Sequence, residues 1–273
     1  MTHGAVSKQL AILEAWLGMP LFERGRSRLF AAPAAARYAL TLSSALDLVE
    51  RGTETLRATD TESPDLVRLS TTGSFAALWL IPRLAAFRAR HPGIEVWVSE
   101  SRELVDLGQP GGPELAIRLG LGPWPGVQAE ALMSDGVVAV CAPSVAARLR
   151  EPQDLARETL LHDEDPRVSW AGWLEAAGLG HPRWASRGPR LADGALVLQA
   201  ARAGQGVALG RRRLAAGQLR SGALVQPFPT QVPLGPSYWL VRPPRGVRLS
   251  SAARTFATWL RETARREETG RES

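Results

Sequence analysis

The sequence predicts a mixed α/β fold preceded by a helical segment, and three observations support this division. Residues 58–64 are polar, poor in apolar side chains and closed by a proline, which is typical of a linker. Before them, apolar residues recur at helical spacing with one break. After them, apolar β-rich runs alternate with helical stretches. We therefore expect two structural units, residues 1–60 and 65–265.

An amphipathic helix is expected at the start of the chain, ending just before Gly18, a suitable C-cap residue. Four apolar side chains repeat on one face of this helix: Val6, Leu10, Leu13 and Leu17. The other face carries small and polar side chains suited to contacts with phosphates or base edges. These are Thr2, His3, Ser7, Lys8 and Gln9.

A two-stranded wing and a long helix are expected to complete the first unit. Residues 20–24 and 29–31 flank a turn at 25–28 that carries arginines. From Pro33, a residue favoured in the first helical turn, a helix should run to about residue 58. We favour pairing of this helix with a second chain over packing on its own domain, because its apolar positions alternate in steps of three and four. The seam comprises Ala35, Tyr38, Leu42, Ala45, Val49, Gly52 and Leu56.

The second unit should begin with a βαβ unit. It would consist of a strand at 66–70, a helix carrying Leu80, Leu84 and Phe87, and a strand at 94–98. Further strands are expected at 115–119, 137–141, 207–209 and 238–241, and helices at 144–149, 169–177, 194–203, 211–216 and 250–265.

Composition and motifs exclude several classes of protein. The 273 residues include no stretch near the roughly 20 apolar residues of a membrane helix, and the first ten lack the pattern of a signal peptide. We expect a cytoplasmic protein with no membrane partner. Its net charge of +6 permits a polyanionic partner without identifying one. Phosphate-binding, nucleophile-elbow and zinc-protease motifs do not occur in the sequence, so we expect no enzyme, no cofactor and no metal.

Two features of the sequence have a chemical and a structural interpretation. Cys141 is interpreted as a buried structural thiol, since no histidine lies near it in the sequence. The acidic run Asp163, Glu164 and Asp165 contains side chains that can hold a cation. A run of this kind beside Pro166 is typical of a solvated loop, which is the interpretation we favour.

Five segments carry a resemblance to one protein family. Residues 2–24, THGAVSKQLAILEAWLGMPLFER, closely resemble the recognition helix and wing entry of LysR-type transcriptional regulators. Four later segments follow in the expected order and resemble the branch that holds the glycine-cleavage activator and the chromosomal β-lactamase regulator. They are TTGSFAALWLIPRLAAFRARHPGI (71–94), ELAIRLG (114–120), LQAARAGQGVALG (198–210) and PLGPSYWLV (233–241).

The resemblance implies a winged helix-turn-helix, a dimerising linker helix, and an effector domain similar to two-lobed, type 2 periplasmic binding proteins. Lobe one would hold residues 66–140 and 243–265, and lobe two residues 141–242. Such a regulator binds operator DNA and a small-molecule effector, here an amino acid or a cell-wall fragment, and assembles as a homodimer or homotetramer. Contact with RNA polymerase is also implied.

The resemblance further implies a ligand pocket between the lobes, near helix N-termini. Thr72, Gly73 and Ser74 would offer hydroxyl and N–H groups to a carboxylate, and the same groups suit helix capping. Asp193 and Gly194 stand where relatives often have serine. The charge of Asp193 would disfavour an anion there.

For four further pocket residues, two roles stay open. Asp106 would take a ligand amine or cap a helix. Arg118 would pair with the ligand or with an acidic neighbour across the cleft, and we favour the structural role. Trp124 and Tyr238 would be pocket walls or ordinary core.

On the first unit, the resemblance implies base contacts from the helix and phosphate contacts from the wing. The helix residues are Thr2, His3, Ser7, Lys8 and Gln9, and the wing residues are Arg24, Arg26 and Arg28. Relatives carry further helices before this motif, so the sequence as given is expected to be N-terminally truncated and to bind DNA poorly. The alternative is a shortened protein that binds an effector or sequesters partners without binding DNA.

Overall fold

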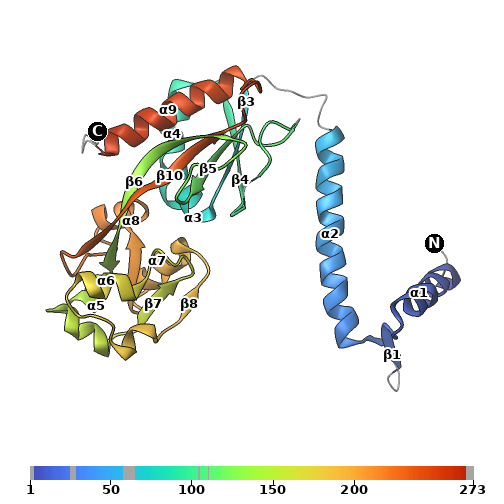
Figure 1. Ribbon diagram of the computed structural model, residues 1–273, viewed down its shortest axis with the longest axis horizontal. Helices are drawn as coiled ribbons and strands as arrows, with labels where there is room; N and C mark the ends of the chain where they lie inside the picture. The colour runs from blue at the N-terminus through green and yellow to red at the C-terminus, as the bar shows by residue number, and fades with distance from the viewer. Residues whose placement is uncertain (1–2, 25–28, 58–64, 104, 110, 269–273) are drawn as a thin grey trace. The chain divides into compact units, whose positions relative to one another are not determined.

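The computed structural model describes residues 3–24, 29–57, 65–103, 105–109 and 111–268 (Figure 1). The chain forms two compact units, Met1–Thr61 and Glu62–Ser273. Within the described residues, no helix combines the length and apolar character needed to cross a membrane.

The first unit is a helix, a hairpin and a long helix (Figure 1). Gly18 has a φ of +70° and ends the first helix, as the sequence predicts, because glycine adopts this conformation without a steric penalty. The hairpin strands are antiparallel. The elements are α1 (His3–Leu17), β1 (Phe22–Arg24), β2 (Leu29–Ala31) and α2 (Pro33–Arg57).

A small apolar core joins α1 to the hairpin and to the start of α2. Leu10, Leu13 and Leu17 pack against Leu21, Ala32 and Ala35. Val6, which the sequence places on the same face, is 43% exposed, because this core covers only the later turns of α1. Along α2, the side chains of Tyr38, Leu42 and Val49 are exposed within the described part of the first unit.

The second unit is built on an eight-stranded sheet with the order β4-β3-β5-β10-β6-β9-β7-β8. The strands are β3 (Leu66–Thr71), β4 (Glu95–Glu100), β5 (Leu115–Leu119), β6 (Gln128–Val140), β7 (Leu160–Asp163), β8 (Arg190–Leu191), β9 (Val207–Arg211) and β10 (Gln231–Arg242). The helices are α3 (Gly73–Phe75), the π-helical η2 (Ala76–Leu80), α4 (Ile81–Arg90), α5 (Pro143–Ala146), η3 (Pro152–Arg157), α6 (Trp170–Ala176), η4 (Arg183–Ser186), α7 (Gly194–Arg202), α8 (Arg212–Arg220) and α9 (Ser251–Glu268).

The predicted βαβ unit is confirmed, since β3 and β4 are parallel and α3, η2 and α4 lie between them in the chain. Several predicted bounds were wrong. The strands expected at 137–141 and 238–241 are the ends of β6 and β10, which pair with each other over most of their length. The helix expected at 144–149 ends at Ala146. Residues 128–136 of β6 contain no β-branched or aromatic side chain, which explains why the pattern missed them.

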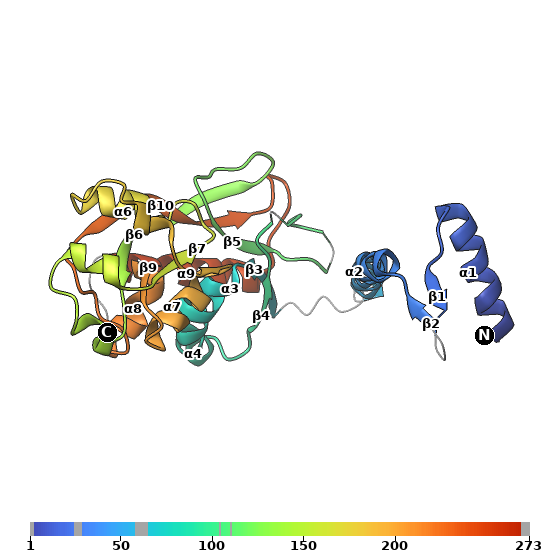
Figure 2. The same cartoon turned by 90° about the horizontal axis from the view of Figure 1, so that it is seen from below.

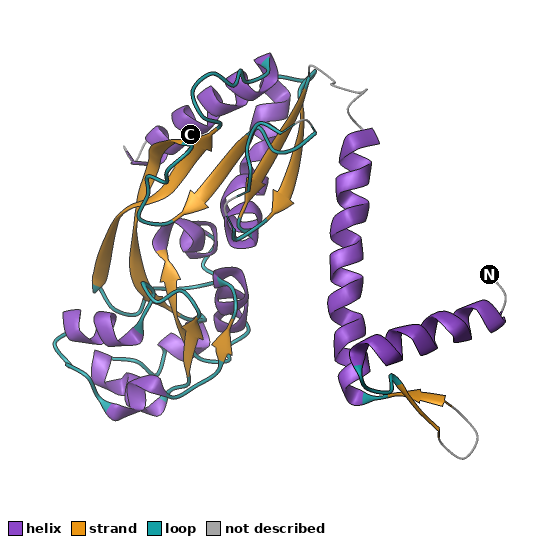
Figure 3. Ribbon diagram, turned by 45° about the vertical axis from the view of Figure 1, so that its right-hand side comes forward, coloured by secondary structure: helices purple, strands orange, loops and turns teal. Residues whose placement is uncertain are grey.

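Two groups of elements lie at the two ends of this sheet (Figures 1 and 3). We call them lobe one (β3–β5, α3, η2, α4 and α9) and lobe two (α5–α8 and β7–β9). The long strands β6 and β10 run through both, because β10 pairs with β5 at Tyr238–Val241 and β6 pairs with β9 at Val137–Val140.

The sheet separates two apolar cores. Val138 and Val140 of β6 pack with α4, α7, α8 and α9, whereas Val137 and Ala139 pack with α5 and α6. This alternation places the two sets of helices on opposite faces. Figure 2 shows α6 and α8 on the two sides of the sheet. In lobe one, Phe87 of α4 meets Phe256 of α9 edge to face, with the ring centroids 4.9 Å apart.

Candidate functional site

A pocket of about 460 Å³ lies between lobe one and lobe two and brings together four of the predicted residues. Thr72 and Ser74 line it from lobe one, and Asp193 and Gly194 from lobe two. The volume is within the roughly 300–1,000 Å³ of small-molecule sites. Charged side chains contribute much of the lining: Arg102, Asp163, Glu164, Asp165, Arg167 and Arg211.

The lobe-one rim of the pocket is the turn from β3 into α3. Thr72 precedes the helix in an extended conformation, and its hydroxyl makes no capping hydrogen bond, so the side chain lines the pocket without capping. Ser74 is buried. Gly73 faces Glu100: a Cβ on this residue would lie 2.7 Å from a Glu100 carboxylate oxygen.

The lobe-two rim is the start of α7. Asp193 caps this helix, because its Oδ1 accepts a hydrogen bond from the Ala195 N–H at 2.7 Å. Its Oδ2 lies 4.0 Å from Arg102 Nη2, and Arg102 Nη1 lies 3.5 Å from Glu164 Oε2. Arg102 follows β4, so these pairs cross the pocket from lobe one to lobe two. They are weak, since the Arg102 side chain is 53% exposed.

The acidic run is part of the pocket, and its interpretation as a solvated loop was wrong for Asp163 and Asp165. Asp165 accepts hydrogen bonds from Arg167 and from the buried Arg211, whose Nη2 lies 2.5 Å from its Oδ2. Burial raises the pKa of Asp165, but the two guanidinium groups outweigh it and lower the pKa to about 2. Burial raises the pKa of Asp163. Among the described residues, no group of three or more histidine, cysteine, aspartate or glutamate side chains is arranged to hold a metal ion.

Three predicted site residues lie in cores and do not line the pocket. Arg118 is buried and donates to Ser70 Oγ at 2.9 Å and to the Ser101 carbonyl at 3.1 Å, while burial lowers its pKa. Tyr238 is buried and donates to Asp135. Trp124 packs edge to face on Trp239 in a small core of lobe one.

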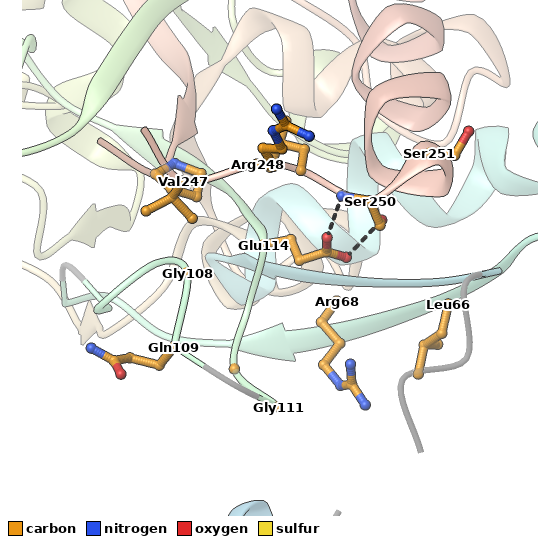
Figure 4. Close-up of a pocket in the computed structure, with 13 residues that line it drawn as sticks. Leu66, Arg68, Gly108, Gln109, Gly111, Glu114, Val247, Arg248, Ser250 and Ser251 are labelled. Atoms are coloured by element: carbon orange, nitrogen blue, oxygen red, sulfur yellow. Dashed lines mark hydrogen bonds between the residues drawn. The ribbon is translucent and has the colours of Figure 1, made fainter. Parts of the chain in front are cut away.

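Asp106 lies at a different place on lobe one, where it accepts a hydrogen bond from Gln109 Nε2 at 2.8 Å. Gln109 lines a pocket of about 400 Å³ at the start of β3 (Figure 4). Both carboxylate oxygens of Glu114 in that pocket are engaged by Ser250, through its N–H at 2.9 Å and its hydroxyl at 3.1 Å. Glu114 therefore fixes the start of α9.

The predicted DNA-contact residues are described only in part. Ser7, Lys8 and Gln9 are exposed on α1. His3 belongs to α1 and Arg24 to β1, but their side chains lie outside the described ones. Thr2, Arg26 and Arg28 lie outside the described residues.

Comparison with protein families agrees with both units. Residues 61–265 match the LysR substrate binding domain, and residues 1–36 match the bacterial regulatory helix-turn-helix proteins of the lysR family. The chain belongs to the LysR family of transcriptional regulators. LysR regulators bind operator DNA and effectors and form oligomers, and they are not enzymes.

This LysR regulator is similar to two curated activators along most of their length. It is 36% identical over 272 residues to the HTH-type transcriptional activator AmpR of Pseudomonas aeruginosa, covering 99% of this chain and 90% of AmpR. It is 33% identical over 267 residues to the glycine cleavage system transcriptional activator of Escherichia coli, covering 95% of this chain and 84% of that activator.

Two solved structures have the same fold. The effector domain of AmpR from P. aeruginosa matches with a TM-score of 0.66 and 39% identity, covering 76% of this chain and 98% of that domain. CrgA, a LysR-type regulator from Neisseria meningitidis, matches with a TM-score of 0.61, covering 97% of this chain and 90% of its own, and at 20% identity it supports the fold alone.

Sequence reasoning missed Arg211, Asp163, Asp165 and Arg102 as pocket residues of this LysR regulator. A signal existed for the first two. Arg211 follows the apolar run 207–210, and Asp163 follows Leu160 and Leu161, so each stands at the carboxyl end of a strand. Ligands in α/β sheets bind at that edge.

Proposed function

We propose that this LysR regulator changes its output at a promoter when a small-molecule effector occupies the pocket between lobe one and lobe two. The observation that carries the proposal is the shared lining of that pocket, with Thr72 and Ser74 from one lobe and Asp193 and Arg211 from the other. A ligand that contacts both lobes favours one arrangement of the lobes, because it binds that arrangement more tightly than others.

We propose that α1 and the β1–β2 wing contact operator DNA. The exposed face of α1 carries Lys8 and Gln9, whose side chains suit phosphate and base-edge contacts. Thr2, His3 and Ser7 would extend this face, and Arg24, Arg26 and Arg28 of the wing would neutralise phosphates.

We propose a homodimer formed through α2 as the basic assembly, with a homotetramer as its further association. The exposed Tyr38, Leu42 and Val49 on α2 support helix pairing between two chains. We further propose that the regulator acts in the cytoplasm and contacts RNA polymerase, since both similar proteins are transcriptional activators. We propose an amino acid as effector, since one of these activators is that of the glycine cleavage system. A cell-wall fragment is the alternative effector.

A gel-shift titration with the purified chain and the intergenic DNA upstream of its gene tests the DNA-binding half of this proposal. We expect a sequence-specific complex that Lys8→Ala weakens and that Arg202→Ala, at an exposed position of α7, leaves unchanged. If the wild-type chain does not shift the DNA, operator binding is contradicted. That result would favour the alternative, a protein that senses its effector or sequesters partners without binding DNA.

A further inference from the structure

Arg211 is buried at the edge of the pocket, and one NH₂ group of its guanidinium has no acceptor among the described residues. It is 5% exposed and is the last residue of β9. Its Nη2 donates to Asp165, whereas its Nη1 is buried and has no hydrogen-bond partner in the part of the chain that the structure describes. A buried donor without an acceptor costs about 1–3 kcal/mol. An acceptor on a ligand would remove this cost.

Asp163 is the complementary group. It is the last residue of β7, and its Oδ1 accepts the Asp165 N–H at 2.9 Å. No salt bridge joins it to a described residue. Burial raises its pKa, as do the carboxylates of Asp165 and Asp193, while the Asp165 N–H and the charge of Arg211 offset part of that rise. A cation on a ligand would stabilise the Asp163 carboxylate in this setting.

The topology places these two groups together. β7 and β9 are adjacent parallel strands, with Leu160 opposite Val207 and Leu161 opposite Ala208. Their carboxyl ends therefore meet at one edge of the sheet, and Asp163 and Arg211 both line the same pocket there. The opposite rim contributes the hydroxyl groups of Thr72 and Ser74.

The remaining pocket charges are already engaged within the protein. Asp165 is held by Arg167 and Arg211. Arg102 lies near Glu164 and Asp193 in weak, exposed pairs, and Asp193 also caps α7. Among the less exposed charged groups of the pocket, this leaves the Arg211 Nη1 group and the Asp163 carboxylate for a ligand.

We propose that the effector carries a free α-amino acid head group, with its carboxylate bound by Arg211 Nη1 and its ammonium bound by the Asp163 carboxylate. The proposal rests on the pocket being the effector site. Arginine suits the carboxylate because its planar fork can hold two acceptors at once, here Asp165 and the ligand.

Thermal unfolding of the full chain with a matched panel of small molecules tests this assignment. The panel is the twenty common amino acids and their D-forms, each beside the acid that lacks the amine and the amine that lacks the carboxyl group. We expect at least one amino acid to raise the unfolding midpoint by several degrees at about 100-fold excess over its Kd, and both truncated analogues to raise it far less. A panel in which no amino acid raises the midpoint would overturn the proposal.

Two variants and their controls assign the contacts. Arg211→Lys keeps a positive charge beside Asp165 but loses the fork, and should weaken amino acid binding about tenfold or more. Wild type should bind the amino acid about tenfold or more tightly than the amine-free analogue, because the charge contact with Asp163 is worth about 1.4 kcal/mol. In Asp163→Asn this contact is lost, and the two affinities should differ by less than about threefold. Arg212→Lys and Asp65→Asn, at exposed positions outside the pocket, should behave as wild type. Circular dichroism checks that each variant folds.

The outcomes separate this proposal from the function of the pocket. If an amine-free or carboxyl-free analogue binds as tightly as the amino acid, and Thr72→Val weakens that binding, the head-group assignment is wrong and the pocket remains the effector site. If substitutions on both rims leave the binding of every ligand unchanged, the head-group assignment is wrong, and the proposal that this pocket is the effector site is wrong as well.

Discussion

The buried hydroxyl of Tyr238 donates a hydrogen bond to Asp135 Oδ2 at 3.0 Å, between the two strands that run through both lobes. Asp135 Oδ1 also accepts the N–H groups of Gly136 at 2.8 Å and Arg213 at 3.0 Å, and Arg213 is in the first turn of α8. The pairing of β6 with β10 shifts its register on both sides of Tyr238. Asp135 thus joins the irregular middle of the sheet to a helix of lobe two.

Removing this hydroxyl should destabilise the second unit. Burial raises the pKa of Asp135, and the hydrogen bonds from Arg213, Gly136 and Tyr238 offset part of that rise. Tyr238→Phe leaves a buried carboxylate with one donor fewer, so we expect a loss of about 1–3 kcal/mol in the free energy of unfolding. Urea unfolding followed by tryptophan fluorescence measures it. Tyr38→Phe on α2 is the matched control, and equal stability of both variants would contradict the account.

The Asp165–Arg211 pair predicts a loss of stability in acid. The folded-state pKa of Asp165 is about 2, below its ordinary value of 3.8, so its contribution is complete above pH 4 and is lost as the pH falls towards 2. Asp165→Asn should cost about 2 kcal/mol at pH 6, and the difference from wild type should shrink between pH 4 and pH 2. Chemical unfolding at several pH values measures the difference, with Asp106→Asn as control. A difference that stays constant with pH would exclude this ion pair as its source.

The end of α9 is predicted to hold the π-helical segment in place. Glu267 Oε2 accepts the indole N–H of the fully buried Trp79 at 2.9 Å, and Glu267 also pairs with Arg83. Glu267→Ala should therefore destabilise the protein by about 1–3 kcal/mol in urea unfolding. Glu262→Ala removes an exposed pair with Arg266 on the same helix and should change stability by less than about 0.5 kcal/mol. Equal effects of the two substitutions would count against a special role for Glu267.

Lys8 is predicted to neutralise a DNA phosphate. Lys8→Ala should weaken binding to specific and unrelated DNA alike, and should reduce the slope of log affinity against log salt by about 0.9. The measurement is a gel-shift titration at several salt concentrations, with Arg202→Ala as control. The same change is expected for Arg26→Ala. An unchanged slope would remove both residues from the phosphate contacts.

Local pattern was sufficient for the elements with strong periodicity. The helix from Pro33 was expected to about residue 58 and ends at Arg57, and the strand at 115–119 has the predicted bounds. The full length of β6 was not predictable in this way, because residues 128–136 owe their extended conformation to pairing with β10, which is about a hundred residues away in sequence.

The pocket residues, too, could be predicted from the sequence only in part. Thr72, Ser74, Asp193 and Gly194 were expected at a ligand site because the resemblance to LysR regulators implies one there, and the structure brings them to one pocket. Arg211 was missed, although its place directly after the apolar run 207–210 was a local sign that it ends a strand. Its burial and its pairing with Asp165 depend on the parallel alignment of β7 with β9, which composition and spacing do not reveal.

The central claim is that a ligand in the pocket between the lobes controls a DNA-bound LysR regulator. Its most direct test is a reporter driven by the target promoter, compared in cells that carry wild type, Thr72→Val with Ser74→Ala, or the control Thr258→Val on the exposed side of α9. The account predicts that the double variant still protects the operator in a footprint while its reporter no longer responds to conditions that change the wild-type signal. A double variant that keeps the full wild-type response would contradict it.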